Sequence, residues 1–338
     1  MANLPLTRLR PMNVHVRRGS KAEDKYRAMA GIDIVLPEAL APGLPPTPAH
    51  DLIYHGGRTI LELEYTNLYV GGDAWMPEDI TNIDSALADA MSEATLNNVM
   101  AQYFATFPAT SFKPSRRLPG AAPARMSQGD VEAMLRDLAG RSQLDGFDYP
   151  STVFNFMLPS GTILSDNPAV GGLKARVSLH LAENEADSLN GLGGFHGSIL
   201  VRARTLYYAV GVYSEQRPDG TANGIPVFDA AWKNVVATFY HELNEARTDP
   251  DVQQVIAGGP STLLGWTSRR GEECGDFPVF EANPLSLVFQ EVPLTAGGTA
   301  PVQFQYSNFV HGPEGPIATP RPPAAWGMHH NRGHQTVV

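Results

Sequence analysis

The sequence predicts an α+β fold, in which a mixed β-sheet precedes a late helix that carries histidine and glutamate side chains. Residues 56–72 alternate apolar and polar side chains between two glycine pairs, as a half-buried strand does. Residues 151–161 and 198–213 read as further strands, and a long helical pattern starts near Asp229. Strands and helices do not alternate as they do in a βαβ series, so an α+β architecture is favoured.

Two further helices are predicted between these strands. Residues 82–107 carry apolar side chains at helical intervals. Ser127 and Asp130 have the spacing of a capping box, which predicts that a helix opens there and runs to residue 140.

The chain divides into three unequal parts. Residues 1–50 end in a proline-rich stretch, which predicts an irregular N-terminal segment. Residues 51–312 are long enough for one α+β domain with a large core. Residues 313–338 are a Pro/His-rich tail, in which His329, His330 and His334 are expected to be disordered.

Composition excludes several classes of protein. The net charge is −10 and the isoelectric point is about 5.4, which argues against nucleic acid as a partner. No apolar run approaches the length of a membrane span. The first 20 residues lack the apolar stretch of a signal peptide, and Cys274 is the only cysteine, so a cytoplasmic location is expected. The oligomeric state stays open.

The stretch FYHELNEARTDP, residues 239–250, carries the chemistry of the predicted late helix. His241 and Glu245 are one helical turn apart and therefore share a face. Glu242 is rotated by about 100° from His241, the relation of a metal ligand to a general base in HExxH enzymes. Asp229 is predicted to cap the start of the helix.

Pro250 is predicted to end this helix. Asp249 then lies in the exit turn, where it caps the helix or braces a loop. The apolar positions of the helix form a broad face, which predicts that it is buried. Those positions are Trp232, Val235, Val236, Phe239, Tyr240 and Leu243.

A metal site needs at least a third ligand from another segment. The glycine-rich stretch GWTSRRGEECGDF, residues 265–277, offers Glu272, Glu273 and Asp276. Adjacent residues of an extended chain point to opposite sides, so only one of the two glutamates is expected to face an ion.

These elements, in this order, resemble a bacterial family related to the plant EXORDIUM (phosphate-induced) proteins. The resemblance spans about residues 54–310. It rests on the segments 54–75, 99–104, 156–161, 194–210, 241–250, 265–266, 271–276 and 302–308. It implies a zincin-like metal-site fold. Members are mostly secreted and carry further cysteines, whereas Cys274 stands alone here.

The resemblance also bears on the third ligand. Glu273 matches the family's Glu-x-Gly-Asp element, so we expect Glu273 to bind the metal. Gly275 gives the backbone the freedom to bring Asp276 close, where it would hold a ligand in place. His196 is the rival ligand, since it would complete a set better suited to zinc. From its GGFHGS context alone, His196 reads as a turn histidine.

The first hypothesis is a metal-dependent, peptidase-like hydrolase that acts on a peptide or a small molecule. It would hold one divalent ion on His241, Glu245 and Glu273, with Glu242 as the base. Zinc is the first choice, and the carboxylates also admit manganese, iron or calcium. In the second hypothesis the protein is a non-catalytic binding or structural module, whose carboxylates hold calcium or pair with Arg247, Arg269 and Arg270. In the third, the ion acts as a Lewis acid on a small metabolite.

Overall fold

The computed structural model describes residues 12–30, 44, 46–168 and 185–323. Its main sheet has the strand order β1-β8-β9-β6-β3-β4. The four strands β9, β6, β3 and β4 run parallel, whereas β8 and β1 are antiparallel to their neighbours. The mixed sheet of an α+β protein is therefore confirmed. The strands of this sheet are β1 (Val14–Val16), β3 (Glu62–Tyr69), β4 (Ala109–Arg117), β6 (Thr152–Met157), β8 (Leu192–Val201) and β9 (Arg204–Gly211).

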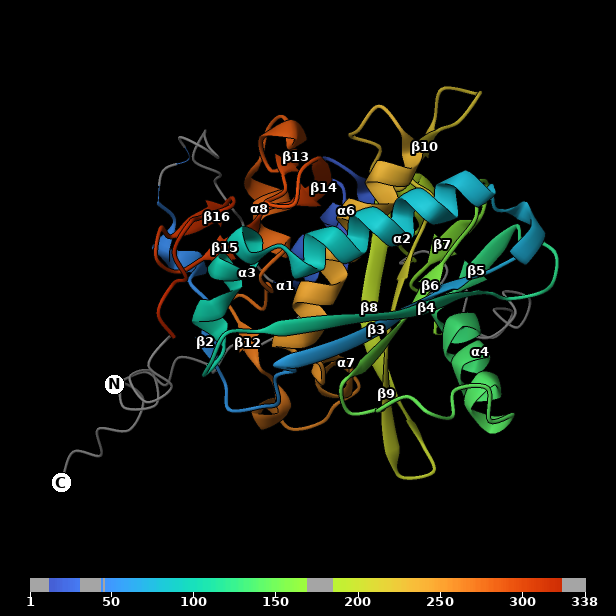
Figure 1. Cartoon of the computed structure of the whole chain (residues 1–338), viewed down its shortest axis with the longest axis horizontal. Coiled ribbons are helices and arrows are strands. Elements are labelled where there is room, and N and C mark those ends of the chain that lie inside the picture. The colour runs from blue at the N-terminus through green and yellow to red at the C-terminus, as the bar shows by residue number, and fades with distance from the viewer. Residues whose placement is uncertain (1–11, 31–43, 45, 169–184, 324–338) are drawn as a thin grey trace.

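Helices cover both faces of this sheet (Figure 1). On one face lie α2 (Pro77–Ser92) and α6 (Ala231–Thr248). On the other lie α1 (Lys21–Ala30) and α4 (Gln128–Gly140). The alternation of side chains along the strands divides the core accordingly: Val153 and Tyr207 pack towards α6, while Phe154 and Tyr208 pack towards α4.

The remaining elements are short. Among the described residues, the other α-helices are α3 (Ala94–Met100), α7 (Val252–Ile256) and α8 (Asp276–Glu281). The two-stranded sheets pair β2 (Ile53–Tyr54) with β12 (Trp266–Thr267), β5 (Arg125–Ser127) with β7 (Ile163–Ser165), β10 (Glu215–Gln216) with β11 (Ala222–Asn223), β13 (Phe289–Pro293) with β14 (Thr299–Gln303), and β15 (Gln305–Ser307) with β16 (Gly312–Glu314).

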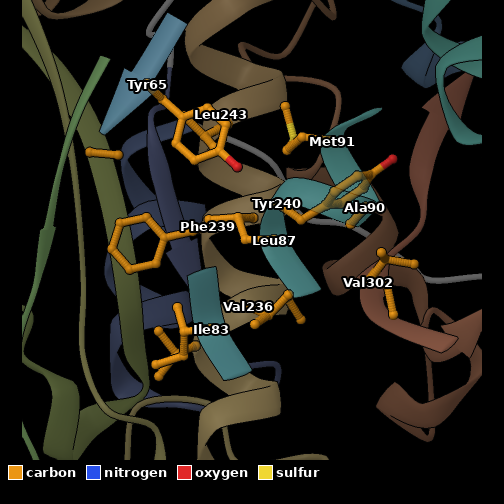
Figure 2. Packing of buried hydrophobic residues seen from close by; sticks show 14 of the residues in the cluster. Tyr65, Ile83, Leu87, Ala90, Met91, Val236, Phe239, Tyr240, Leu243 and Val302 are labelled. Atoms are coloured by element: carbon orange, nitrogen blue, oxygen red, sulfur yellow. The ribbon is translucent and has the colours of Figure 1, made fainter. Parts of the chain in front are cut away.

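α6 is the central helix of the core. Every residue from 234 to 248 is buried. Figure 2 shows Val236, Phe239 and Leu243 of α6 clustered with Ile83 and Leu87 of α2. Close packing on all sides leaves such a helix no room to shift, so its polar side chains are held in fixed positions.

Several predictions about the helices are confirmed. Ser127 and Asp130 form the predicted capping box at the start of α4. α6 ends at Thr248 with Asp249 as its C-cap. The helix predicted at 82–107 is instead two helices, because the chain turns extended at Glu93, which caps α3.

Two predictions are wrong. Asp229 does not cap α6: the N-cap is Ala230, and the Asp229 carboxylate accepts a hydrogen bond from Lys233 Nζ at 2.8 Å. Residues 1–50 are not irregular throughout, since β1 and α1 lie within them. β1 escaped prediction because three residues are too few for an alternation to show.

Candidate metal centre

The motif turn of α6 begins the site. His241 Nε2 lies 3.0 Å from Glu245 Oε2, and both side chains are fully buried. Yet neither atom has a hydrogen-bond partner of suitable geometry among the described residues. The two atoms lie close together but are not aligned on each other, which is the arrangement of two ligands directed at a third point.

Gln303, at the end of β14, orients the ring of His241. Its Nε2 donates to the backbone oxygens of Gly275 at 3.0 Å and Phe304 at 2.6 Å, which leaves Gln303 Oε1 as an acceptor towards His241 Nδ1. Hydrogen positions follow from such networks. His241 Nδ1 is therefore the donor to Gln303, and Nε2 is the nitrogen that faces the carboxylate of Glu245. A ligand histidine held by its other nitrogen is typical of metal sites.

The loop before α8 brings backbone and carboxylates to this pair. Gly275 N donates to Glu245 Oε1 at 3.0 Å, and Glu273 N donates to Asp276 Oδ2 at 2.9 Å. His241, Glu245 and Asp276 each offer a ligand atom within 4.8 Å of the other two. Asp276, expected in a supporting role, thus lies nearer to the pair than the sequence indicated.

Glu273, the expected third ligand, lies beside His196. Glu273 Oε1 is 3.6 Å from His196 Nε2. Its neighbour Glu272 faces elsewhere and lies 3.1 Å from His50 Nδ1, in agreement with the expectation that only one of the two glutamates faces the site. Asp249 braces a loop: its Oδ1 accepts a hydrogen bond from Gly265 N at 2.8 Å.

His196 does not lie in a turn, so that interpretation of its glycine-rich context is wrong. It lies within β8, on the face towards α6, because Phe195 and Ile199 point to the opposite face. Its Nδ1 is 3.3 Å from Glu242 Oε2 and 3.8 Å from Glu245 Oε2. Gly194 lets the strand approach α6 this closely, because a Cβ there would lie 3.0 Å from Thr238 Cγ2 and 3.1 Å from Glu242 Oε1.

His15 also belongs to the cluster around His241, although no sequence pattern indicated it. It lies in β1, which pairs with β8, and its ring stacks on that of His241 with centroids 4.1 Å apart. The lone pair of an imidazole nitrogen lies in the ring plane, so two stacked rings cannot both direct a nitrogen at one ion. His15 therefore covers His241 rather than sharing an ion with it.

The buried carboxylates have almost no positive charge around them. Among the described residues, the ion-pair partners of Glu242, Glu245 and Glu273 are histidines, not lysine or arginine. Arg247, considered as a partner, donates instead to Asn97, Thr110 and backbone oxygens.

Burial without a lysine or arginine partner among the described residues shifts the pKa values of these groups. Burial raises the pKa of Glu242, and Glu245 and Asp276 raise it further. Burial and Glu245 likewise raise the pKa values of Glu273 and Asp276. Burial lowers the pKa of His196 to about 4, so this imidazole is neutral at pH 7. Among the described residues no lysine or arginine pairs with these carboxylates, whereas a divalent cation would stabilise their ionised form.

A second feature that fits a metal ion is a group of buried polar atoms without hydrogen-bond partners among the described residues. Most buried polar atoms in proteins have hydrogen-bond partners. Here a group of fully buried oxygens and nitrogens in one place has none among the described residues. They are His196 Nε2, His241 Nε2, Glu242 Oε1, Glu245 Oε2, both carboxylate oxygens of Glu273, and Asp276 Oδ1.

The other residues singled out in the sequence lie apart from this cluster. His55 Nε2 lies 3.0 Å from Thr267 Oγ1, Trp266 is buried in the core, and Asn308 bridges to the backbone of Leu52. Cys274 is buried, and burial raises the pKa of its thiol, so it is no nucleophile. His329, His330 and His334 lie outside the described residues.

Replacement of Gln303 by alanine is expected to weaken metal binding without removing a ligand. Loss of the acceptor for His241 Nδ1 frees the ring to rotate and to exchange tautomers, and such changes cost roughly 10–100-fold in metal affinity. Competition with a chromophoric chelator measures this. Gln290→Ala is the matched control, because Gln290 donates only to backbone oxygens outside the cluster. Equal affinities in the two variants would remove Gln303 from the site.

Glu281, at the end of α8, is expected to make stability depend on pH. It is 3% exposed, and neither carboxylate oxygen has a hydrogen-bond partner among the described residues. Burial raises its pKa from 4.5 to about 8, although Arg18 opposes the shift. The folded state thus holds a proton that the unfolded state releases, and stability is lost as the pH rises from 4.5 to about 8.

Glu281→Gln is therefore expected to raise the free energy of unfolding at pH 8.5 by about 1–2 kcal/mol, after a discount for solvent screening. The difference should vanish below pH 4. Denaturant unfolding at both pH values measures it, beside Glu62→Gln, which changes an exposed glutamate. An equal gain at both pH values would contradict the role of ionisation.

Comparison of the chain with protein-family models, with curated proteins and with solved structures finds no match. The resemblance to the EXORDIUM-related family and the zincin-like fold therefore stay predictions. Among the described residues, no helix is both long enough and apolar enough to cross a membrane.

Proposed function

We propose that this protein is a divalent-metal-dependent hydrolase whose centre is the buried cluster around His241 and Glu245. The observation that carries the proposal is the pair of buried, unaligned ligand atoms, His241 Nε2 and Glu245 Oε2, which lie 3.0 Å apart while Gln303 contacts the other nitrogen of the histidine. Asp276 supplies a third ligand in place of Glu273. Zinc is the first choice of ion, since it accepts nitrogen and carboxylate ligands together.

In this reaction the ion and the residues of the cluster would have separate roles. A bound divalent ion would supply Lewis acidity to a water molecule and to a substrate carbonyl. Glu242 accepts the proton of the attacking water and returns it to the leaving group. The substrate is a peptide or another small carbonyl compound.

Substrate entry requires part of the cover to move, because every member of the cluster is at most 1% exposed. His15 is the part that lies directly over His241, and it comes from a three-residue strand at the edge of the sheet. A cavity of about 670 Å³ lies beside α4, and none of its lining residues belongs to the cluster. The substrate would therefore enter past β1.

This same burial favours a second candidate function, in which the ion is structural. Structural sites are closed by protein ligands, whereas catalytic sites keep an open position. The ion would then bind α6, β8 and the loop before α8 together, and Glu242 would activate no water.

Metal content and turnover separate the candidates. Protein purified without chelator is expected to contain divalent metal, and His241→Ala is expected to contain far less. Negligible metal in both proteins would sink both candidates. Glu242→Gln is expected to keep its fold and to lose roughly 10²–10⁴-fold in the turnover of peptide and ester substrates. Turnover equal to that of the wild type would leave only the structural candidate.

A further inference from the structure

The cluster contains more ligands than one ion needs. A structural zinc ion takes four protein ligands and a catalytic one takes three. Six side chains with ligand atoms meet here beneath His15, and all are fully buried or at most 1% exposed. They are His196, His241, Glu242, Glu245, Glu273 and Asp276.

Three groups of possible ligands occur among the described residues, and two of them share Glu245; the third, His15, His241 and Glu242, contains the stacked pair of histidines. His241, Glu245 and Asp276 are one group, and His196, Glu242 and Glu245 are another, each with its ligand atoms within 4.8 Å of one another. Glu245 Oε2 stands between the histidines, 3.0 Å from His241 Nε2 and 3.8 Å from His196 Nδ1. In two-metal sites the ions lie about 3.5–4 Å apart, which suits a carboxylate shared in this way.

The charge of the cluster points the same way. Glu242, Glu245, Glu273 and Asp276 would carry four negative charges when ionised, and no lysine or arginine among the described residues pairs with them. One divalent ion would balance only two of these four carboxylates when all are ionised, and a buried charge without compensation is costly. Two divalent ions would balance it.

We infer that the cluster is a dinuclear centre, in which a second divalent ion of the zinc or manganese class binds His196, Glu242 and Glu245. This inference rests on the proposed metal centre and extends it. Glu242 binds the second ion through Oε2, the oxygen beside His196, and keeps Oε1, which has no hydrogen-bond partner among the described residues, as its proton acceptor.

Glu273 then has a role of its own. Its Oε1 lies 3.6 Å from His196 Nε2, the nitrogen that points away from Glu242. A carboxylate behind a ligand histidine orients the ring and raises its basicity. Glu273 is therefore a positioning residue for His196.

Metal titration tests the second ion. Chelator-stripped protein is equilibrated with Zn²⁺, freed of excess ion and analysed for metal. The wild type is expected to bind two ions per chain and His196→Ala one, while His55→Ala, which changes a histidine outside the cluster, should bind two. Saturation of the wild type at one ion would overturn the inference and leave the proposed function standing. No bound ion would overturn both.

A second measurement uses the wild type alone, so its result does not depend on whether the His196→Ala variant folds. The stripped protein is loaded with Mn²⁺ to saturation, and its electron paramagnetic resonance spectrum is recorded. Two Mn²⁺ ions that share Glu245 are expected to give an exchange-coupled spectrum. The six-line signal of isolated Mn²⁺ at full loading would contradict the dinuclear centre.

Discussion

Removal of metal by a strong chelator is expected to lower the unfolding temperature of this protein at pH 8 by about 6 °C. A ligand present at about 1,000 times its dissociation constant contributes about 4 kcal/mol, and a chain of this length loses about 0.7 kcal/mol per degree near its midpoint. Calorimetry with and without chelator measures the shift, and excess Zn²⁺ should restore the original temperature.

The shift should also shrink as the pH falls. Burial first, and neighbouring carboxylates second, raise the pKa values of Glu242, Glu273 and Asp276 in the metal-free folded state. The stripped protein therefore keeps protons that the unfolded chain releases, and it loses stability as the pH rises. At pH 5 the carboxylates are nearer to neutral without an ion. A shift that is larger at pH 5 than at pH 8 would contradict this account of the charges.

Gly275→Ala is expected to destabilise the protein by about 2–3 kcal/mol, as overpacking in a rigid core does, and to weaken metal binding at least about tenfold. A Cβ at this position would overlap His241 Nδ1 and would lie 2.9 Å from Glu245 Oε1. Both predicted ligands would have to move, although Gly275 itself binds no metal.

Gly312→Ala is the matched control for this variant. A Cβ there meets no atom within 4 Å, and Gly312 lies in β16, away from the cluster. Chelator competition and denaturant unfolding of both variants give the two effects. Metal affinity unchanged in Gly275→Ala, with the fold intact, would show that the loop does not contribute to the site.

The ligands on α6 could be predicted because they are a local pattern. His241 and Glu245 are one turn apart in sequence, and the apolar residues around them already indicated burial. Pro250 likewise set the end of the helix, since it constrains only its immediate neighbour.

The rest of the site depends on contacts between distant segments. His15 comes from a strand of three residues, whose place is decided by its pairing with β8. Gln303 matters only because β14 ends beside His241. The GGFHGS stretch looked like a turn because of its glycines, yet it lies in β8, where Gly194 lets the sheet approach α6. No local rule states which distant segment will meet a helix.

The central claim about this protein is that a divalent ion binds between His241 Nε2, Glu245 Oε2 and Asp276. A crystal of the protein grown with Zn²⁺ and measured at the zinc absorption edge gives the answer. We predict an anomalous peak about 2.0–2.2 Å from the ligand nitrogen or oxygen of each of these three side chains. A crystal with no peak there, and with His241 Nε2 hydrogen-bonded to Glu245 instead, would contradict it.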